Sequence, residues 1–242
     1  MKKSLFFTLM LAMFAIRSAN AQTKNVAVVS FFINKQIDVT DFGEVAYLAV
    51  TKLNEDPAFN LTPMLNDFHT RFFDDYSKSL PFAVLPEEKV LKNEAYKAFV
   101  PVGNATSGIL NTANFLTAVD GYKILLHYVG SPNEENMAKM FSEADGIMTV
   151  SIHFKLIKIG FGGMGVVKVS AVSTLALYNK NGDKVFSIKQ DAKSKNMAPL
   201  VGGVPVMTPE KIMPMCESAI DELKAALQKD MRKIIKKSDA KL

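Results

Sequence analysis

Residues 146–190 constrain the fold more than any other part of the chain, because apolar and polar residues alternate along them between turn residues. Alternation with a period of two is typical of strands that have one buried face. Three strands are predicted, at residues 147–159, 166–178 and 184–190. The last two are joined across Asn181-Gly182, a pair that favours a tight hairpin turn. The sequence therefore predicts a three-stranded antiparallel meander with one face against a core.

The rest of the chain supplies elements that cover this sheet. The continuous apolar run at residues 25–33 predicts a central strand buried on both faces. Further strands are expected at residues 82–85 and 122–128. Apolar spacing predicts helices at residues 40–53, 62–76, 87–99, 110–119 and 133–144. Apart from the short helix at residues 110–119, the sequence does not indicate a role for residues 101–120.

Two helices have well-defined apolar positions. The helix at residues 40–53 is expected to turn Val45, Leu48, Ala49 and Leu53 toward the core. The final helix begins at Thr208-Pro209 and repeats apolar residues every three or four positions. Cys216 lies on this stripe as the only cysteine, so it is expected to be a buried thiol and cannot form an intramolecular disulfide.

These elements predict a single α/β (α+β) domain at residues 22–242, with a mixed sheet, a C-terminal antiparallel meander covered by helices, and a long C-terminal helix. Residues 1–21 have the basic start, apolar centre and Ala19-Asn20-Ala21 end of a signal peptide. We expect cleavage after Ala21 and a periplasmic protein. Gln22 follows rather than a cysteine, so a lipoprotein anchor is not expected.

The charge of the mature chain argues against nucleic acid as a partner. Removal of the signal peptide takes away Lys2, Lys3 and Arg17 and no acidic residue, so the formal charge falls from +5 to +2. A chain this close to neutral lacks the basic field that nucleic-acid binding requires.

No pattern in the sequence predicts catalysis, a cofactor or a metal. Residues 160–165 satisfy G-x-G-x-x-G, but a strand follows where a dinucleotide site needs a helix. His69, His127 and His153 each lack a second ligand nearby in the sequence, so structural or solvated roles are expected for them. Asp74 and Asp75 are adjacent in a helix and diverge. The protein is predicted not to be an enzyme.

Two segments are candidates for binding. The first is the glycine-rich hairpin tip, with Ile157, Phe161, Met164 and Val166 as candidate contact residues. The second is the basic end of the last helix, formed by Lys229, Arg232, Lys233, Lys236 and Lys237. Such an end suits an acidic partner or peripheral contact with an anionic membrane, but it also suits the negative end of a helix dipole in a core-facing helix.

Several short motifs resemble one family of bacterial envelope proteins. They are VAVVSF at residues 26–31, FAVL at 82–85, EADGIMTVSI at 143–152 and NGDKVF at 181–186, followed by the long helix. This order is similar to proteins related to the curli-secretion lipoprotein, the lipoprotein activators of penicillin-binding proteins and the N-terminal domain of TolB. The resemblance implies a non-enzymatic protein that acts through protein contacts. The chain departs from it by lacking the lipid-anchoring cysteine and by residues 101–120, which have no counterpart.

The leading hypothesis from the sequence is an exported, non-catalytic envelope protein that binds another envelope protein or an assembly, including one of its own copies, through the sheet edge or the glycine-rich tip. One alternative is a periplasmic carrier of an apolar small molecule in a methionine-lined pocket. A further alternative is a hydrolase with a site assembled from distant residues.

Overall fold

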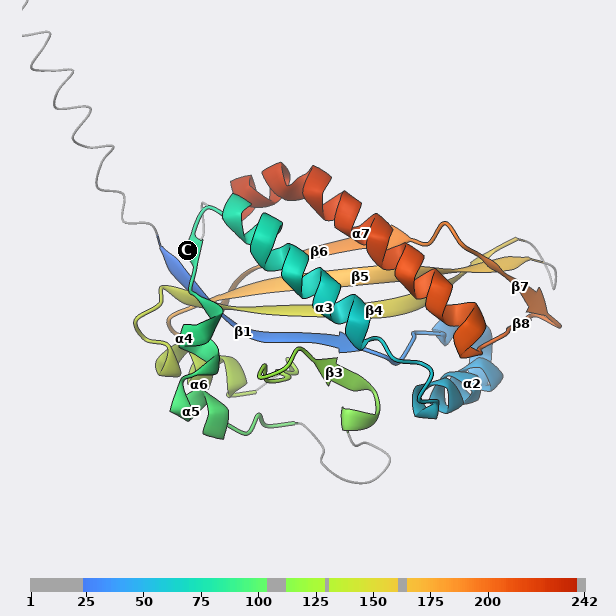
Figure 1. Ribbon diagram of the computed structural model, residues 1–242, viewed down its shortest axis with the longest axis horizontal. Helices are drawn as coiled ribbons and strands as arrows, with labels where there is room; N and C mark the ends of the chain where they lie inside the picture. Colours follow the sequence, from blue (N-terminus) through green and yellow to red (C-terminus); the bar gives the residue numbers. More distant parts are fainter. Residues whose placement is uncertain (1–23, 104–111, 129–130, 161–164, 239–242) are drawn as a thin grey trace, which may run out of the picture.

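The computed structural model describes residues 24–103, 112–128, 131–160 and 165–238, the last eight of these as helix backbone only. A mixed sheet runs through the centre of the molecule, with helices against both of its faces (Figure 1). Its strands are β1 (Asn25–Asn34), β2 (Ala83–Val84), β3 (Leu116–Ala118), β4 (Gly146–Ile159), β5 (Val166–Asn179), β6 (Lys184–Lys193), β7 (Ala198–Val201) and β8 (Val204–Pro205). The predicted α/β fold is confirmed.

The predicted meander forms the larger part of the sheet. β5 lies between β4 and β6 and is antiparallel to both, and its first residues also pair with β7. β1 is parallel to β4 on one side, and on its other side it pairs with β2 and with the antiparallel β3. Residues 26–33 of β1 are all buried, as expected for a central strand.

One face of the sheet packs against α3 (Thr62–Arg71) and α7 (Pro209–Ser238), which cross it side by side (Figure 1). This larger core contains Phe31, Phe68, Phe154 and Leu223. The other face is covered over part of its length by α4 (Glu87–Leu91), α5 (Glu94–Ala98) and α6 (Asn133–Met140), which pack around Tyr96 and Phe141. Short π and 3-10 turns occur at Thr40–Phe42, Phe72–Tyr76, Ser77–Ser79 and Thr112–Asn114.

The prediction of one continuous helix at residues 87–99 is wrong, because the chain forms two shorter helices there, α4 and α5. Asn93 lies between the two helices with an extended backbone, and its side chain accepts a hydrogen bond from the Tyr96 amide. An asparagine that caps a new helix competes with continuation of the preceding one. The break directs the Tyr96 side chain into the smaller core beneath α4, α5 and α6, where it is fully buried.

The strand predicted at residues 122–128 is wrong, since only Lys123 makes an isolated bridge, to Ser30. This segment runs along β1 where the strand has an irregularity between Val28 and Ser30. Side-chain hydroxyls replace the backbone ladder there. Ser30 Oγ donates to the Lys123 carbonyl (2.8 Å) and accepts from the Leu125 amide (3.1 Å). The helix predicted at residues 110–119 is also wrong, because β3 pairs with the end of β1 instead.

The turns of the meander follow the sequence. Gly182 has a φ of +81° in the turn between β5 and β6, as its Asn-Gly pair predicts. The long connection after β6 contains an unpredicted hairpin, β7–β8, whose tip holds Gly202 and Gly203 at positive φ. Cys216 is fully buried on α7, and burial raises the pKa of its thiol. None of the helices within the described residues is both long and apolar enough to cross a bilayer.

Candidate binding surface at the α2 end of the sheet

The helix α2 (Gly43–Glu55) turns large apolar side chains toward solvent. Val45, Tyr47 and Leu48 are 63%, 54% and 56% exposed. The prediction that Val45 and Leu48 face the core is wrong, because Ala46, Val50 and Leu53 occupy the inward face. The predicted and the observed inward residues both fit helical spacing. The fold buries the observed set, which places the small Ala46 against the core.

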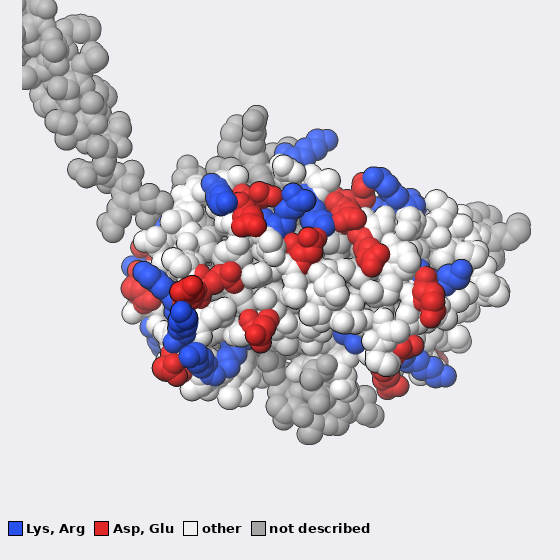
Figure 2. Space-filling view, in the orientation of Figure 1, with Lys and Arg blue, Asp and Glu red and all other residues white. Residues whose placement is uncertain are grey.

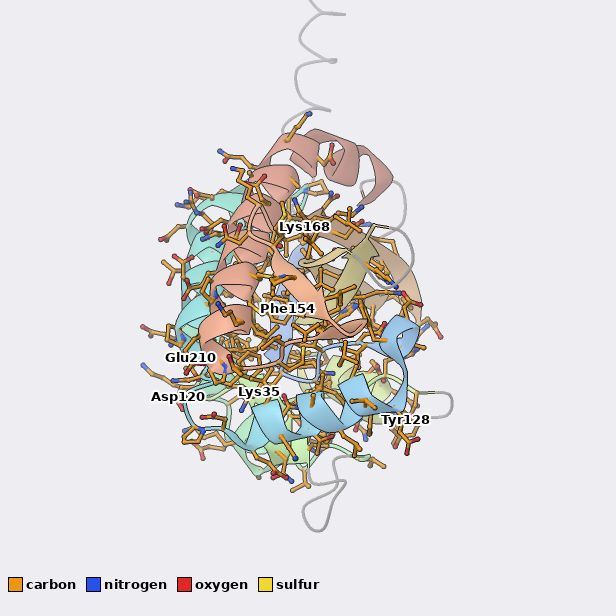
Figure 3. All side chains as sticks on the ribbon, turned by 90° about the vertical axis from the view of Figure 1, so that its right-hand side faces the viewer. Lys35, Asp120, Tyr128, Phe154, Lys168 and Glu210 are labelled. Atoms are coloured by element: carbon orange, nitrogen blue, oxygen red, sulfur yellow. The ribbon has the colours of Figure 1, made fainter. Side chains whose placement is uncertain are left out.

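The β7–β8 hairpin lies next to this helix, since β8 contacts α2. Val201 of β7 is 64% exposed, and Met197, just before β7, is 55% exposed. Both elements lie at the same end of the sheet in Figure 1, and Figure 3 looks onto this end, with α2 in front and the hairpin above it. We call Val45, Tyr47, Leu48, Met197 and Val201 the α2 surface. Exposed apolar side chains that gather at one place are typical of interaction sites.

A cavity of about 580 Å³ opens beside α2. Its walls come from the connection between β1 and α2, from the first turns of α2 and from β4. Its apolar lining is Ile37, Val39 and Phe154, and its polar lining includes Asn34, Gln36, Asp38, Glu44, Tyr47 and His153. We call this the α2 cavity. Tyr47 belongs both to the cavity and to the α2 surface, so the two are continuous.

The connection from β1 to α2 is fixed onto β4 by backbone hydrogen bonds. The Asp38 amide donates to the Phe154 carbonyl, and the Leu156 amide donates to the Asp38 carbonyl, both at 2.9 Å. Ile37 and Val39 on either side of Asp38 are buried in the larger core. This attachment leaves the Asp38 side chain facing the cavity rather than the core.

The ionisable groups around the cavity differ in their electrostatics. Hydrogen bonds from the hydroxyl and the amide of Thr40 lower the pKa of Asp38, with a smaller contribution from Lys155. The Lys155 ammonium lies 3.3 Å from a carboxylate oxygen of Asp41 and 4.0 Å from one of Asp38. Burial lowers the pKa of His153, as does Lys189, so its imidazole is neutral at neutral pH.

The other two histidines have structural partners. His69 Nε2 lies 2.7 Å from a Glu87 carboxylate oxygen, to which the Tyr122 hydroxyl also donates (2.8 Å). His127 Nδ1 lies 2.9 Å from the nearly buried carboxylate of Glu134. His153 is partly buried in β4 and lines the α2 cavity. Across the described ranges, no three His, Cys, Asp or Glu side chains are grouped to hold a metal.

The structure places the sequence-predicted tip only in part. Phe161 and Met164 lie outside the described residues, whereas Ile157 and Val166 are partly buried at the ends of β4 and β5. Ile159 beside them is 44% exposed, and Val166 pairs with Pro199 of β7. The start of β5 therefore adjoins β7, and the role of the tip in binding stays a prediction.

The predicted basic surface is likewise described in part. Lys229 is exposed on α7, and Arg232, Lys233, Lys236 and Lys237 lie where only the helix backbone is described. On the face shown in Figure 2, basic and acidic side chains are interspersed rather than gathered by sign. The basic surface stays a prediction.

No family model matches the chain, and no curated protein matches it. Among solved structures, it is similar to a neuraminyllactose-binding hemagglutinin homolog from Helicobacter pylori, with 10% identity over 90% of both chains and a TM-score of 0.37. It is also similar to lipoprotein GNA1162 from Neisseria meningitidis, with 14% identity over 71% of this chain and 83% of that one and a TM-score of 0.29. Similarities this distant assign no family, and the resemblance found in the sequence motifs stays a prediction.

Proposed function

We propose that the protein is exported to the periplasm and acts there without catalysis, by binding another protein of the cell envelope through the α2 surface. The observation that carries this proposal is the outward apolar side of α2, where Val45, Tyr47 and Leu48 are each more than half exposed. Burial of such side chains on a partner is favourable, since each fully buried apolar side chain contributes about 1.5–3 kcal/mol. This surface includes Val201 of β7, at the end of the sheet where β7 and β8 pair, and Ile159 beside the glycine-rich tip is 44% exposed.

The export part of the proposal rests on residues 1–21, which have the three regions of a signal peptide. Those residues lie outside the described structure. Fractionation of cells that express the full-length chain, followed by N-terminal sequencing, tests this part. A mature protein that begins at Gln22 and is released with the periplasmic fraction is expected, whereas retention of residues 1–21 in the cytoplasm would contradict export.

The binding part is tested by chemical cross-linking in cells with a tagged chain and its variants. Leu48→Ser and Val201→Ser remove apolar contacts of the α2 surface. Val100→Ser is a matched control, because Val100 is 76% exposed and follows α5, at the other end of the sheet (Figure 1). The first two variants should lose the cross-linked partner and the control should keep it. Equal capture by all three variants would refute the proposed surface.

A second candidate function is the carriage of a small molecule, favoured by the volume of the α2 cavity. About 580 Å³ lies within the usual range of ligand sites, about 300–1,000 Å³. The cavity is not the methionine-lined pocket expected from the sequence, because none of its lining residues is a methionine. Native mass spectrometry of the purified protein tests this function, with a bound small molecule as the expected result. No specific observation favours the hydrolase alternative.

A further inference from the structure

Among the charged groups around the α2 cavity, carboxylates are in excess. Two carboxylates line the cavity, those of Asp38 and Glu44, and no lysine or arginine does. Asp41 adds a third carboxylate next to them, and the nearby ammonium of Lys155 is shared between Asp38 and Asp41. Lys189 lies beyond His153. Acidic groups therefore outnumber the basic ones at the mouth of the cavity.

Glu44 is the carboxylate without a compensating group. It lies exposed in the first turn of α2, and neither a hydrogen bond nor an ion pair joins its carboxylate to another described residue. Tyr47 follows it by three positions, so the two side chains are neighbours on the helix, and both line the cavity. A carboxylate beside an aromatic ring is a favourable environment for an ammonium or guanidinium group.

The apolar part of the cavity fits the stem of a long basic side chain. The exposed ring of Tyr47 supplies this apolar wall, because Ile37, Val39 and Phe154 are buried in the larger core behind the lining. Lysine and arginine bury their methylene stems against apolar walls while the charged end meets polar groups. Outside the cavity, Val45 and Leu48 continue the apolar contact along α2.

We infer that the partner segment that docks on the α2 surface is a protein segment in which a lysine or arginine is flanked by apolar residues, with the basic side chain in the α2 cavity. This inference rests on the proposed function and specifies the partner. The basic group pairs with Glu44, and the flanking residues contact Val45 and Leu48. An anionic membrane is disfavoured as the occupant, because its phosphates would meet the carboxylates of Asp38, Asp41 and Glu44.

The test uses short acetylated, fluorescein-labelled peptides in which leucines flank a central lysine, glutamine or glutamate. Fluorescence anisotropy with the purified mature chain gives the dissociation constant of each. The lysine peptide should bind about two- to fivefold more tightly than the glutamine peptide, as expected for an ion pair with an exposed carboxylate. The glutamate peptide should bind most weakly.

Two matched variants locate the charge. Glu44→Gln should remove most of the preference for lysine. Glu55→Gln should retain it, because Glu55 is exposed at the other end of α2 and does not line the cavity. Absence of binding by the lysine peptide, equal binding of the three peptides, or an unchanged preference in Glu44→Gln would overturn the inference.

Failure of the inference is distinguishable from failure of the proposed function. If Leu48→Ser loses the cross-linked partner in cells while the peptides show no preference for lysine, the α2 surface binds a partner of another character. If Leu48→Ser still captures the cross-linked partner, the proposed surface is refuted, and the inference is refuted as well.

Discussion

Tyr96→Phe removes a single hydroxyl group that joins three separate parts of the fold. The Tyr96 side chain is fully buried, and its hydroxyl donates to the Val29 carbonyl at 2.8 Å. It also accepts a hydrogen bond from the Lys123 amide at 2.8 Å. Val29 lies at the irregularity of β1, where the pairing with β4 shifts register. The hydroxyl therefore replaces strand pairing at this point.

The magnitude follows from the two groups that lose their partner. A buried polar group left without a hydrogen bond costs about 1–3 kcal/mol. Val29 is fully buried, whereas Lys123 is only partly buried, so water can reach its amide in part. We expect the free energy of unfolding to fall by about 2 kcal/mol, which for a domain of this size lowers Tm by about 4–8 °C.

Urea denaturation followed by far-UV circular dichroism measures this difference. Tyr47→Phe is the matched control, because Tyr47 is 54% exposed and its hydroxyl bonds to no other described residue. The control should change the free energy of unfolding by less than about 0.5 kcal/mol. If Tyr96→Phe were as stable as Tyr47→Phe, the account of how residues 122–128 are held against β1 would be refuted.

Three further predictions concern pH, the thiol and the turns. Burial raises the pKa of Tyr76 from 10.0 to about 12. The stability that this group contributes is therefore complete below pH 10 and is lost as pH rises through 12, by about 3 kcal/mol at most. The urea midpoint of Tyr76→Phe should therefore fall less over this pH range than that of the wild type. Cys216 should react with a water-soluble thiol reagent only on unfolding, and rapid labelling of the native protein would contradict its burial. Gly182→Ala should destabilise by about 1–3 kcal/mol, because φ is +81° and the new Cβ would lie 2.6 Å from the Glu135 backbone. Gly202→Ala, at φ +61° with open space around it, should cost less, and equal urea midpoints would contradict the close approach.

The sequence correctly predicts the strands and helices that bury one face, because apolar residues repeat along that face with the period of the element. Met148, Val150 and Ile152 alternate with polar neighbours and are buried in the larger core, so the meander could be predicted from period alone. The same holds for Ile212, Cys216 and Ile220 on α7, whose spacing is that of a helix with one buried side.

Errors arise where contacts between distant residues decide the structure. The apolar run at residues 122–128 has the composition of a strand, but the hydroxyls of Ser30 and Tyr96 hold it against β1 by side-chain bonds. Neither hydroxyl is close to this segment in the sequence. In α2, two apolar stripes fit the same helical period, and only packing shows that Val50 is inside and Leu48 outside.

The candidate site could not be predicted because it is assembled from separate segments. Asp38 and Glu44 lie before and within α2, whereas His153 and Phe154 come from β4, far along the chain. The second apolar stripe of α2 was the signal available in the sequence. A helix with more apolar residues than one buried face requires is a candidate for an exposed contact surface.

The proposed function requires that the exposed side of α2 contact another protein. Site-specific photo-cross-linking in cells tests it most directly, with a photoreactive amino acid at position 48 of the full-length chain and, as a control, at position 100. One discrete covalent adduct with a different protein is expected from position 48, and none from position 100. No adduct from position 48, or the same adducts from both positions, would contradict it.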